Sequence, residues 1–354
     1  MEKLKENTSC EILIIGAGIT GLLAAHKLRE KGHDVLVIEK DGIGCHSTRK
    51  STGLVQYSSD IMLHKLLANH QIDGVNFYLE SLKAINEVEA ISQHFKDKTV
   101  FRRCPSLYLA TTIEDIPMLK KEYEALSTHG FSVKEVSEAE LLKDYGIFKT
   151  YGILTEDDAS VHPFNYTQAL AAHFQSMGGK LYEGYFLDAL DGVARLKGDF
   201  TISYDFIIYA LGYETVRYKP MAGVIKRASY VFCCNPLIKT QDIMVWETAR
   251  PYLYQNTLAP GMVVVGGGDV DLKKYEPKNA YLPIQKLKKQ YMDWYGLKDL
   301  EIDDFYSAEF FTFVDGLPKY KVEDNHIYLY PYGGNGIVYS LYLVNQLLQN
   351  VFNF

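Results

Sequence analysis

Nearly continuous apolar runs near the start of the chain predict buried parallel strands. Residues 11–18 (EILIIGAG) and 33–40 (HDVLVIEK) are such runs, and residues 19–32 between them place apolar side chains at helical spacing before a terminal glycine. Two buried strands joined by one helix of this length form a βαβ unit with a parallel sheet. Residues 205–214 (DFIIYALGYE) and a strand beginning at residue 325 repeat the apolar pattern.

The middle of the chain alternates between apolar and polar positions in shorter segments. Between residues 227 and 268 this alternation predicts antiparallel strands, and residues 99–112 are expected to form a hairpin-like pair of strands. Parallel segments at both ends with an antiparallel block between them indicate an α/β (α+β) fold whose parts are separated in sequence. Helices are expected within residues 60–95, 114–129, 138–145, 163–179 and 282–295, and after the glycines of 333–336.

Composition and charge narrow the class of protein. The chain has 354 residues, of which 47% are apolar and 23% charged, as is ordinary for a globular protein. A net charge of −7 without a basic block argues against nucleic-acid binding. The polar start, and the lack of a run of ~20 apolar residues, predict a cytoplasmic protein without a membrane span. Five cysteines without paired spacing and ten scattered histidines indicate neither a disulfide framework nor a metal site.

A glycine pattern follows the first strand. The segment IIGAGITG places Gly16, Gly18 and Gly21 in the spacing GxGxxG. The first glycine allows a tight turn, the second lets a pyrophosphate approach the backbone, and the third lets helix and strand pack closely. Glu39 ends the next strand, at the spacing expected for a carboxylate that accepts hydrogen bonds from an adenosine ribose. The pattern predicts a dinucleotide site; the alternative is a turn that merely joins a strand to a helix.

A second glycine cluster, YPYGGNGIVYS at residues 331–341, immediately precedes the last helix. Glycine loses more conformational entropy on folding than other residues, so Gly333, Gly334 and Gly336 indicate either a sharp turn or the close approach of another group. FAD and NAD both fit the first glycine loop, and the other segments must decide between them.

Five segments together resemble the D-amino acid oxidase superfamily of FAD-dependent amine oxidoreductases, nearest to the glycine oxidase and sarcosine oxidase types. They are IIGAGITGLLAAHKLREKGHDVLVIEK, STRKSTGLVQYSSD, DFIIYALGYE, RPYLYQNT with VVVGGGD, and DGLPKY with PYGGNGIVYS. The resemblance implies a Rossmann-like FAD-binding domain of the glutathione-reductase type and a second, mainly antiparallel-sheet substrate domain. It places residues 1–98, 151–215 and 316–354 in the discontinuous FAD-binding domain, and residues 99–150 and 216–315 in the substrate domain.

The resemblance also implies a cofactor site. In such proteins the loop matching STRKSTGL passes the flavin, and the last glycine turn lies against the ring, where its amides would stabilise negative charge on the reduced flavin. A non-covalent FAD is expected: Lys50 stands where some relatives carry an attaching histidine, His46 is a weak alternative, and no cysteine follows Cys234. The implied cofactor-binding residues are Gly16, Ala17, Gly18, Ile19, Thr20, Gly21, Glu39, Lys40, Ser47, Thr48, Arg49, Lys50, Ser51, Thr52, Gly53, Ala210, Leu211, Gly212, Gly333, Gly334, Asn335, Gly336 and Ile337.

The chemistry implied by the resemblance is hydride transfer from an amine-bearing carbon to flavin N5, giving an imine, with oxygen or another acceptor reoxidising the flavin. Relatives that take amino acids hold the carboxylate with an arginine. Gln255 occupies one such position and no arginine precedes DGLP, so the expected substrate is a small amine or amino acid of open identity. No catalytic side chain is assigned; the substrate-side candidates are Lys50, Arg250, Tyr252, Tyr254 and Gln255, with Arg102 and Arg103 as further anchors for a carboxylate.

Two alternatives stay open. One is an amine dehydrogenase that passes electrons to a protein or quinone instead of oxygen. The other is a flavoprotein that keeps FAD without turnover, which the two missing arginines motivate. A tRNA-modifying role, known in one branch of the superfamily, is disfavoured by the negative charge and the lack of a basic stripe. The sequence does not predict the oligomeric state.

Overall fold

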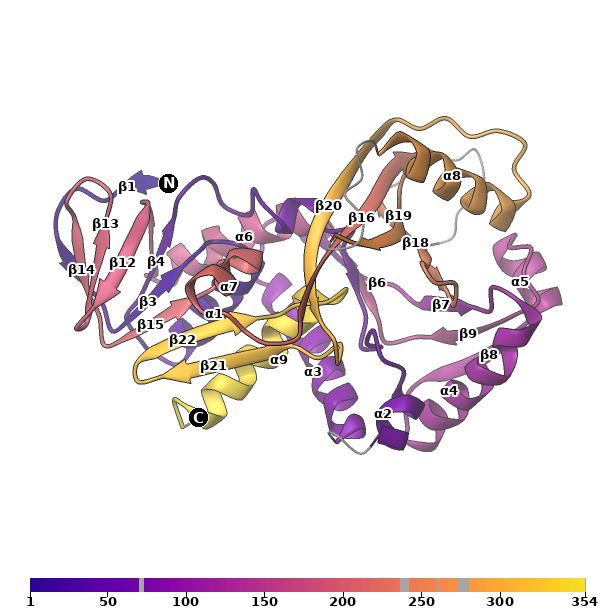
Figure 1. The fold of residues 1–354 in the computed structure, drawn as a ribbon, viewed down its shortest axis with the longest axis horizontal. Coiled ribbons are helices and arrows are strands. Elements are labelled where there is room, and N and C mark those ends of the chain that lie inside the picture. Colours follow the sequence, from indigo (N-terminus) through magenta and orange to yellow (C-terminus); the bar gives the residue numbers. More distant parts are fainter. Residues whose placement is uncertain (70–72, 236–241, 260, 273–279, 354) are drawn as a thin grey trace.

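The computed structural model describes residues 1–69, 73–235, 242–259, 261–272 and 280–353. Its first large sheet has seven strands, which are parallel except for a final antiparallel pair. In spatial order they are β1 (Glu2–Lys3), β11 (Lys180–Glu183), β4 (Val35–Glu39), β3 (Ile12–Ile15), β15 (Phe206–Tyr209), β22 (His326–Tyr330) and β21 (Lys319–Glu323). Segments from both ends of the chain therefore share one sheet, as the apolar pattern predicted (Figure 1).

Helices cover one face of this sheet. They are α1 (Ile19–Glu30), α6 (Pro163–Ser176) and α9 (Gly336–Asn350), with α3 (Gly74–Ser92) packed on α6 and α9. Ile12, Ile14 and Val37 point into this helical layer, whereas Leu13 and Leu36 point to the opposite face and are equally buried. The strands are continuously apolar because both faces of the sheet are covered.

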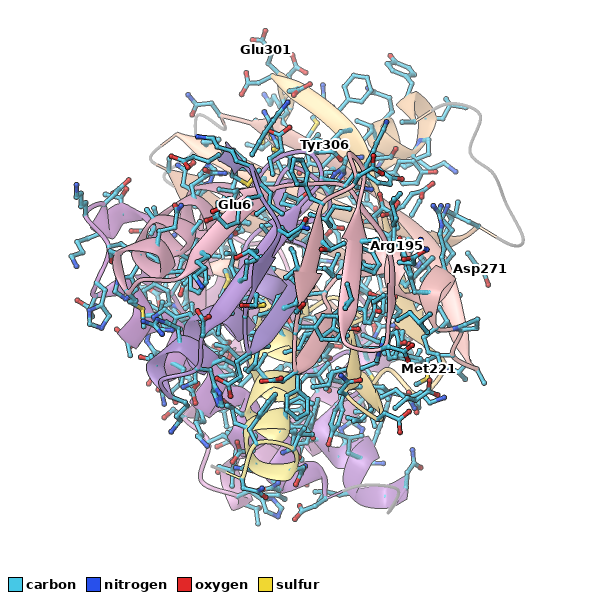
Figure 2. All side chains as sticks on the ribbon, turned by 90° about the vertical axis from the view of Figure 1, so that its left-hand side faces the viewer. Glu6, Arg195, Met221, Asp271, Glu301 and Tyr306 are labelled. Atoms are coloured by element: carbon cyan, nitrogen blue, oxygen red, sulfur yellow. The ribbon has the colours of Figure 1, made fainter. Side chains whose placement is uncertain are left out.

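A small sheet covers the opposite face. It consists of β12 (Phe186–Leu190), β13 (Val193–Leu196), β14 (Thr201–Ser203) and β2 (Thr8–Ser9), in that order. Its inner residues, such as Ala194 and Ile202, are buried against the first sheet. Its outer side carries Arg195 (Figure 2), which forms an exposed ion pair with Asp188. The first sheet thus lies between a helical layer and a second β layer.

The second large sheet has eight strands and lies at the other end of the molecule (Figure 1). In spatial order they are β20 (Asp304–Phe313), β16 (Val224–Cys234), β19 (Met262–Asp271), β18 (Leu253–Ala259), β17 (Met244–Glu247), β7 (Ser106–Leu109), β9 (Tyr151–Thr155) and β8 (Val133–Ser137). All neighbours are antiparallel except β17 and β7. Helix α8 (Tyr281–Tyr295) buries Tyr291 and Trp294 against this sheet, in one cluster with Phe232 and Leu253. Residues 236–239 of the predicted strand after 227 lie outside the described residues.

One expectation about these strands was wrong, and the structure motivates a proposed change to a second. The segment 99–112 forms no hairpin, because β6 (Phe101–Arg103) pairs with β10 (Ala159–Val161) in a separate three-stranded sheet with β5 (Leu54–Val55), while β7 joins the eight-stranded sheet. The predicted domain division assigned residues 151–155 to the FAD-binding part. They form β9, which pairs with β7 and β8 in the second sheet, so we propose a boundary after residue 155.

The remaining elements are short, apart from helix α4, which packs beside β8 and β9. They are α2 (Leu63–Asn69), α4 (Ile116–Thr128), α5 (Glu138–Tyr145), α7 (Thr215–Tyr218), and the 3-10 turns η1 (Thr48–Lys50), η2 (Lys98–Val100), η3 (Ile113–Asp115) and η4 (Gly212–Glu214). Within the described ranges, the helices are too short or too polar to cross a bilayer.

Candidate functional site

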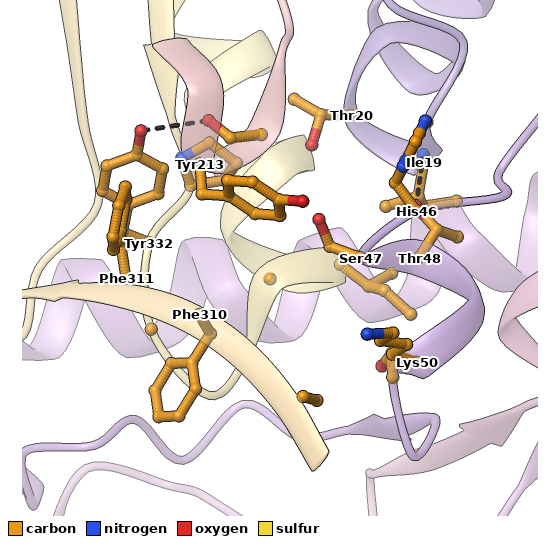
Figure 3. Close-up of a pocket in the computed structure, with 18 of the residues that line it drawn as sticks. Ile19, Thr20, His46, Ser47, Thr48, Lys50, Tyr213, Phe310, Phe311 and Tyr332 are labelled. Carbon is orange, nitrogen blue, oxygen red and sulfur yellow. Dashed lines mark hydrogen bonds between the residues drawn. The ribbon is translucent and has the colours of Figure 1, made fainter. Parts of the chain in front are cut away.

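A cavity of about 530 Å³ lies between the two large sheets. Its walls come from the first glycine loop, η1, the ends of β4 and β15, the second glycine loop, and the inner faces of β16, β18 and β20. Figure 3 shows the part of the wall formed by the start of α1, η1 and β20. The volume is in the range of pockets that enclose a small ligand or cofactor. Segments that are far apart in the sequence therefore line the same cavity.

The glycines of the first loop have different structural reasons. Gly16 has φ +108°, and a Cβ there would lie 2.6 Å from the carbonyl oxygen of Ala210. A Cβ on Gly21 would lie 1.9 Å from the carbonyl oxygen of Gly16, so helix α1 packs against the loop only with glycine. At Gly18 the nearest atom is Thr48 Oγ1 at 3.4 Å, and this residue lines the cavity. Gly16 and Gly21 shape the turn, and Gly18 keeps its cavity side open.

The end of β4 is fixed by backbone hydrogen bonds. Glu39 accepts from the Ala17 amide at 2.8 Å and from the Asp41 amide at 3.0 Å, and it lines the cavity. A carboxylate has further lone pairs, so Glu39 can still accept a ribose hydroxyl. Beside it, His46 Nε2 lies 2.6 Å from Asp41 Oδ2. His46, the weak alternative for flavin attachment, is therefore engaged at the Glu39 end of the cavity.

The loop from 47 to 53 turns against the start of α1. Thr48 Oγ1 accepts the Ile19 amide at 3.1 Å, which ties η1 to the helix N-terminus (Figure 3). Arg49 instead points away, with its guanidinium 5.3 Å from the centre of the Phe164 ring. At Gly53, with φ +76°, a Cβ would lie 2.1 Å from the Val161 carbonyl oxygen. Arg49 and Gly53 shape or flank the loop and do not line the cavity.

Most predicted cofactor residues do line it. Lys40 lines the cavity, and its ammonium lies 2.8 Å from Glu214 Oε2. Tyr332 donates a hydrogen bond to the Gly212 carbonyl at 3.0 Å, and this bond joins the end of β15 to the second glycine loop (Figure 3). Ala17, Gly21, Arg49 and Gly53 are the predicted residues that do not. Those that do are Gly16, Gly18, Ile19, Thr20, Glu39, Lys40, Ser47, Thr48, Lys50, Ser51, Thr52, Ala210, Leu211, Gly212, Gly333, Gly334, Asn335, Gly336 and Ile337.

The second glycine loop packs against a carboxylate. A Cβ on Gly333 would lie 2.9 Å from Asp60 Oδ2, and one on Gly334 would lie 2.9 Å from Asp60 Oδ1. The Gly334 amide donates to Asp60 Oδ2 at 3.1 Å, and the Asn335 side chain donates to the Ser58 carbonyl. The expected reason for these glycines was a flavin ring. The Asp60 carboxylate and, at Gly333, the φ of +137° already favour glycine in this loop, whatever else approaches it.

The far end of the cavity is built on β18 and β19. Tyr252 and Tyr254 both line it, because they alternate around Leu253 and so share one face of the chain, and Gly266 makes room because a Cβ there would lie 2.4 Å from the Tyr254 ring. Gln255 points to the other face. It is fully buried, accepts a hydrogen bond from Tyr295 at 2.8 Å, and is not in the cavity wall. Gln255 was therefore wrong as a substrate-side candidate, because the strand alternation turns it toward α8.

Other predicted anchors lie elsewhere. Arg103 pairs with Glu89 at 2.6 Å, and Arg102 donates to the Thr257 carbonyl at 2.9 Å; neither lines the cavity. Arg250 does line it, with its guanidinium 5.0 Å from the centre of the Tyr252 ring, and Lys50 reaches it from η1. The two adjacent arginines on β6 were wrong as candidates.

The cavity residues that were not found from the sequence include three charged side chains and a tryptophan. Asp60, Arg227, Trp246 and Asp269 all face the same end of the cavity. Burial raises the pKa of Asp269 to about 6. Burial also raises the pKa of Asp60 above its ordinary value, while the Gly334 amide, Arg250 and Arg227 act to lower it. An acid directly after the glycine run VVVGGG was a signal for Asp269, but no sequence pattern marked the other three.

The fold and the cavity define a dinucleotide-binding oxidoreductase of the flavoprotein class. The model of the FAD dependent oxidoreductase (DAO) family matches residues 11–343, and the chain belongs to this family. FAD is thus its cofactor, and the open Gly18 side, the Glu39 carboxylate and the helix N-termini of α1 and α9 fit that dinucleotide.

Individual relatives are distant. Gamma-glutamylputrescine oxidoreductase of Escherichia coli is 22% identical over 95% of this chain and 82% of its own length. A putative Rieske 2Fe-2S iron-sulfur protein, YhfW of Bacillus subtilis, is 27% identical over 51% of this chain, and the match spans 35% of that protein. Glycine oxidase from Geobacillus kaustophilus has a similar fold, with a TM-score of 0.81 at 17% identity over 96% of this chain and 94% of that one.

Proposed function

We propose that this protein oxidises the C–N bond of a small amine or amino acid, with FAD as the bound oxidant. The observation that carries the proposal is the continuity of the cavity, which runs from the dinucleotide loop at Gly18 to an end where Asp60 and Asp269 face the same space as Tyr252 and Tyr254. Carboxylates are suited to bind an amine, and similarity to a glycine oxidase and a gamma-glutamylputrescine oxidoreductase supports an amine-bearing substrate.

The protein's part in this reaction is binding and orientation. FAD supplies the hydride acceptor when bound. Glu39 and the amides at the start of α1 would hold its adenosine and pyrophosphate parts, and the loop at Gly333–Gly336 would approach its ring. At the far end, Trp246 and the two tyrosines enclose the substrate and exclude water, while the carboxylates set the position of its nitrogen.

The electron acceptor is oxygen or another carrier, and in the first case the second product is hydrogen peroxide. The cofactor is non-covalent in this proposal, because Lys50 stands where some relatives carry an attaching histidine and His46 is engaged with Asp41. Acid precipitation of the purified protein should therefore release FAD into the supernatant.

The test is anaerobic reduction of the FAD-loaded protein, followed by its visible spectrum, with glycine, sarcosine, proline, D-amino acids and simple alkylamines. Bleaching by at least one compound is the expected result. Failure of every compound would support a flavoprotein without turnover and contradict the proposal. Rapid reoxidation in air would identify an oxidase, and slow reoxidation a dehydrogenase.

A further inference from the structure

Four charged side chains surround the far end of the cavity without neutralising one another directly. Asp60 follows β5, Arg227 lies on β16, Arg250 precedes β18 and Asp269 lies on β19, and all four line the cavity. Among the described residues, no ion pair within 4.0 Å joins any two of them. The space between them can therefore receive a charged ligand group.

In Asp269, one of the two carboxylate oxygens lacks a partner. Its Oδ1 is buried and has no hydrogen-bond partner within the described part of the chain. A buried carboxylate oxygen that receives no hydrogen bond costs free energy. A ligand that donates a hydrogen bond to Asp269 Oδ1 would remove this cost. The position is built by the strand: the register between β16 and β19 shifts from Ala228 opposite Val270 to Tyr230 opposite Gly267, which leaves Asp269 in a bulge. Such bulges re-aim a side chain.

Asp60 differs because it is anchored. The Gly334 amide donates to its Oδ2, and Arg227 and Arg250 both act on its charge. Its side chain lines the cavity and is exposed to that open space. Asp60 thus adds negative potential beside Asp269 while its geometry is fixed by the glycine loop.

We infer that Asp269, assisted by the negative charge of Asp60, binds the ammonium group of the substrate and takes one of its protons before oxidation. This deepens the proposed function and rests on it. In this step an N–H bond of the ammonium breaks, an O–H bond forms at Asp269 Oδ1, and the nitrogen keeps the electron pair. The pair changes from ammonium and carboxylate to neutral amine and carboxylic acid, and nothing is oxidised. A free electron pair on nitrogen is what the C–N oxidation then requires.

The surroundings of Asp269 suit this role. Burial and, less strongly, Asp60 raise its pKa to about 6, whereas the Ser229 hydroxyl, Arg227 and Tyr252 lower it. The group is therefore ionised at pH 7 but accepts a proton more readily than an ordinary aspartate. Burial holds the pKa of both Tyr252 and Tyr254 above its ordinary value, so these phenols stay neutral there. From β20, Glu309 also lines the cavity, and it is paired with Lys226 at 2.7 Å.

Binding is tested without turnover by tert-butylammonium, which has no hydrogen on the carbon that bears nitrogen and cannot transfer hydride. Its titration into the FAD-loaded protein, followed by the flavin spectrum and by thermal shift, should show saturable binding, whereas the uncharged tert-butanol should bind at least tenfold more weakly. Asp269→Asn should weaken the ammonium by at least tenfold, and the exposed Asp293→Asn on α8 should leave the Kd unchanged. An unchanged Kd in Asp269→Asn, or no binding to the native protein, would overturn the inference. Saturable binding with no amine able to reduce FAD would leave the inference standing and refute only the proposed function.

Proton transfer is tested by the pH profile of anaerobic FAD reduction. The acid limb in the native protein should report Asp269, and Asp60→Asn should move this limb to lower pH because it removes the neighbouring charge that raises the pKa. Asp269→Glu should retain part of the reduction rate, and Asp269→Asn should lose at least 100-fold and also lose the limb. An acid limb that persists unchanged in Asp269→Asn would exclude this residue as the proton acceptor.

Discussion

The different roles of the first-loop glycines give a sharp prediction for Gly18→Ala. Gly18 has φ −74° and ψ 179°, a conformation that alanine adopts freely, and the new Cβ would lie 3.4 Å from Thr48 Oγ1. Loss of glycine at this helix N-cap costs about 0.5–1 kcal/mol. The apoprotein should therefore lose only about 1 °C in Tm. In the FAD complex the methyl group would face the pyrophosphate that we place beside Gly18, and it should prevent one charge-assisted hydrogen bond, worth about 1.5–3 kcal/mol.

The expected result is a rise in the Kd for FAD of about tenfold to about 150-fold. The assay is titration of apoprotein with FAD, followed by quenching of flavin fluorescence, beside thermal unfolding of the same apoprotein by circular dichroism. Gly21→Ala is the matched control. Its Cβ would lie 1.9 Å from the Gly16 carbonyl, so it should destabilise the apoprotein itself. A Gly18→Ala protein that binds FAD within twofold of the native Kd would refute the placement of the pyrophosphate at this residue.

Further predictions concern other parts of the molecule. Glu39→Gln should raise the Kd for FAD about tenfold, because an amide offers one acceptor oxygen where the carboxylate now serves the Ala17 and Asp41 amides as well as the ribose; an unchanged Kd would contradict this. His26 is fully buried, and burial lowers its pKa to about 3. As the pH falls below about 6.5, the unfolded chain binds a proton at His26 before the folded protein does, so the free energy of unfolding drops by up to about 1.4 kcal/mol per pH unit until the folded pKa is reached. In urea unfolding, His26→Leu should therefore show a weaker dependence of stability on acid pH, and an identical dependence would refute this. Gln255→Ala should lower Tm without changing the Kd for tert-butylammonium, because the side chain bonds Tyr295 outside the cavity.

Strand and helix positions were predictable where the period of the apolar positions and the length of the segment indicated the same type of element. The βαβ unit at residues 11–40, the helix at Pro163 and the last strand, glycine loop and helix all follow from apolar spacing and glycine or proline signals. The failed hairpin at residues 99–112 shows the limit. The local sequence is equally compatible with β6 and β7 pairing as a hairpin and with each strand joining a different sheet. The observed arrangement is set by long-range pairing of β6 with β10 and of β7 with β17.

The cavity shows the same division between local and long-range information. The dinucleotide loop was predictable because its glycine spacing and the positive φ of Gly16 are local features of one turn of chain. Asp60 was not, because its role depends on a backbone amide 274 residues away at Gly334. Gln255 was misplaced because alignment with relatives fixed its position along β18 but not the face it shows, although the alternation with Tyr254 already contained that information.

The central claim is oxidation of a carbon that bears nitrogen, at the end of the cavity lined by Asp60 and Asp269. The most direct measurement compares an amine that reduces the FAD with its hydroxy analogue, such as glycine with glycolate, in anaerobic mixing followed at the flavin absorbance. The account predicts bleaching by the amine and none by the hydroxy compound, since a neutral hydroxyl cannot replace an ammonium between the two carboxylates. Bleaching by the hydroxy compound at an equal or higher rate would contradict it.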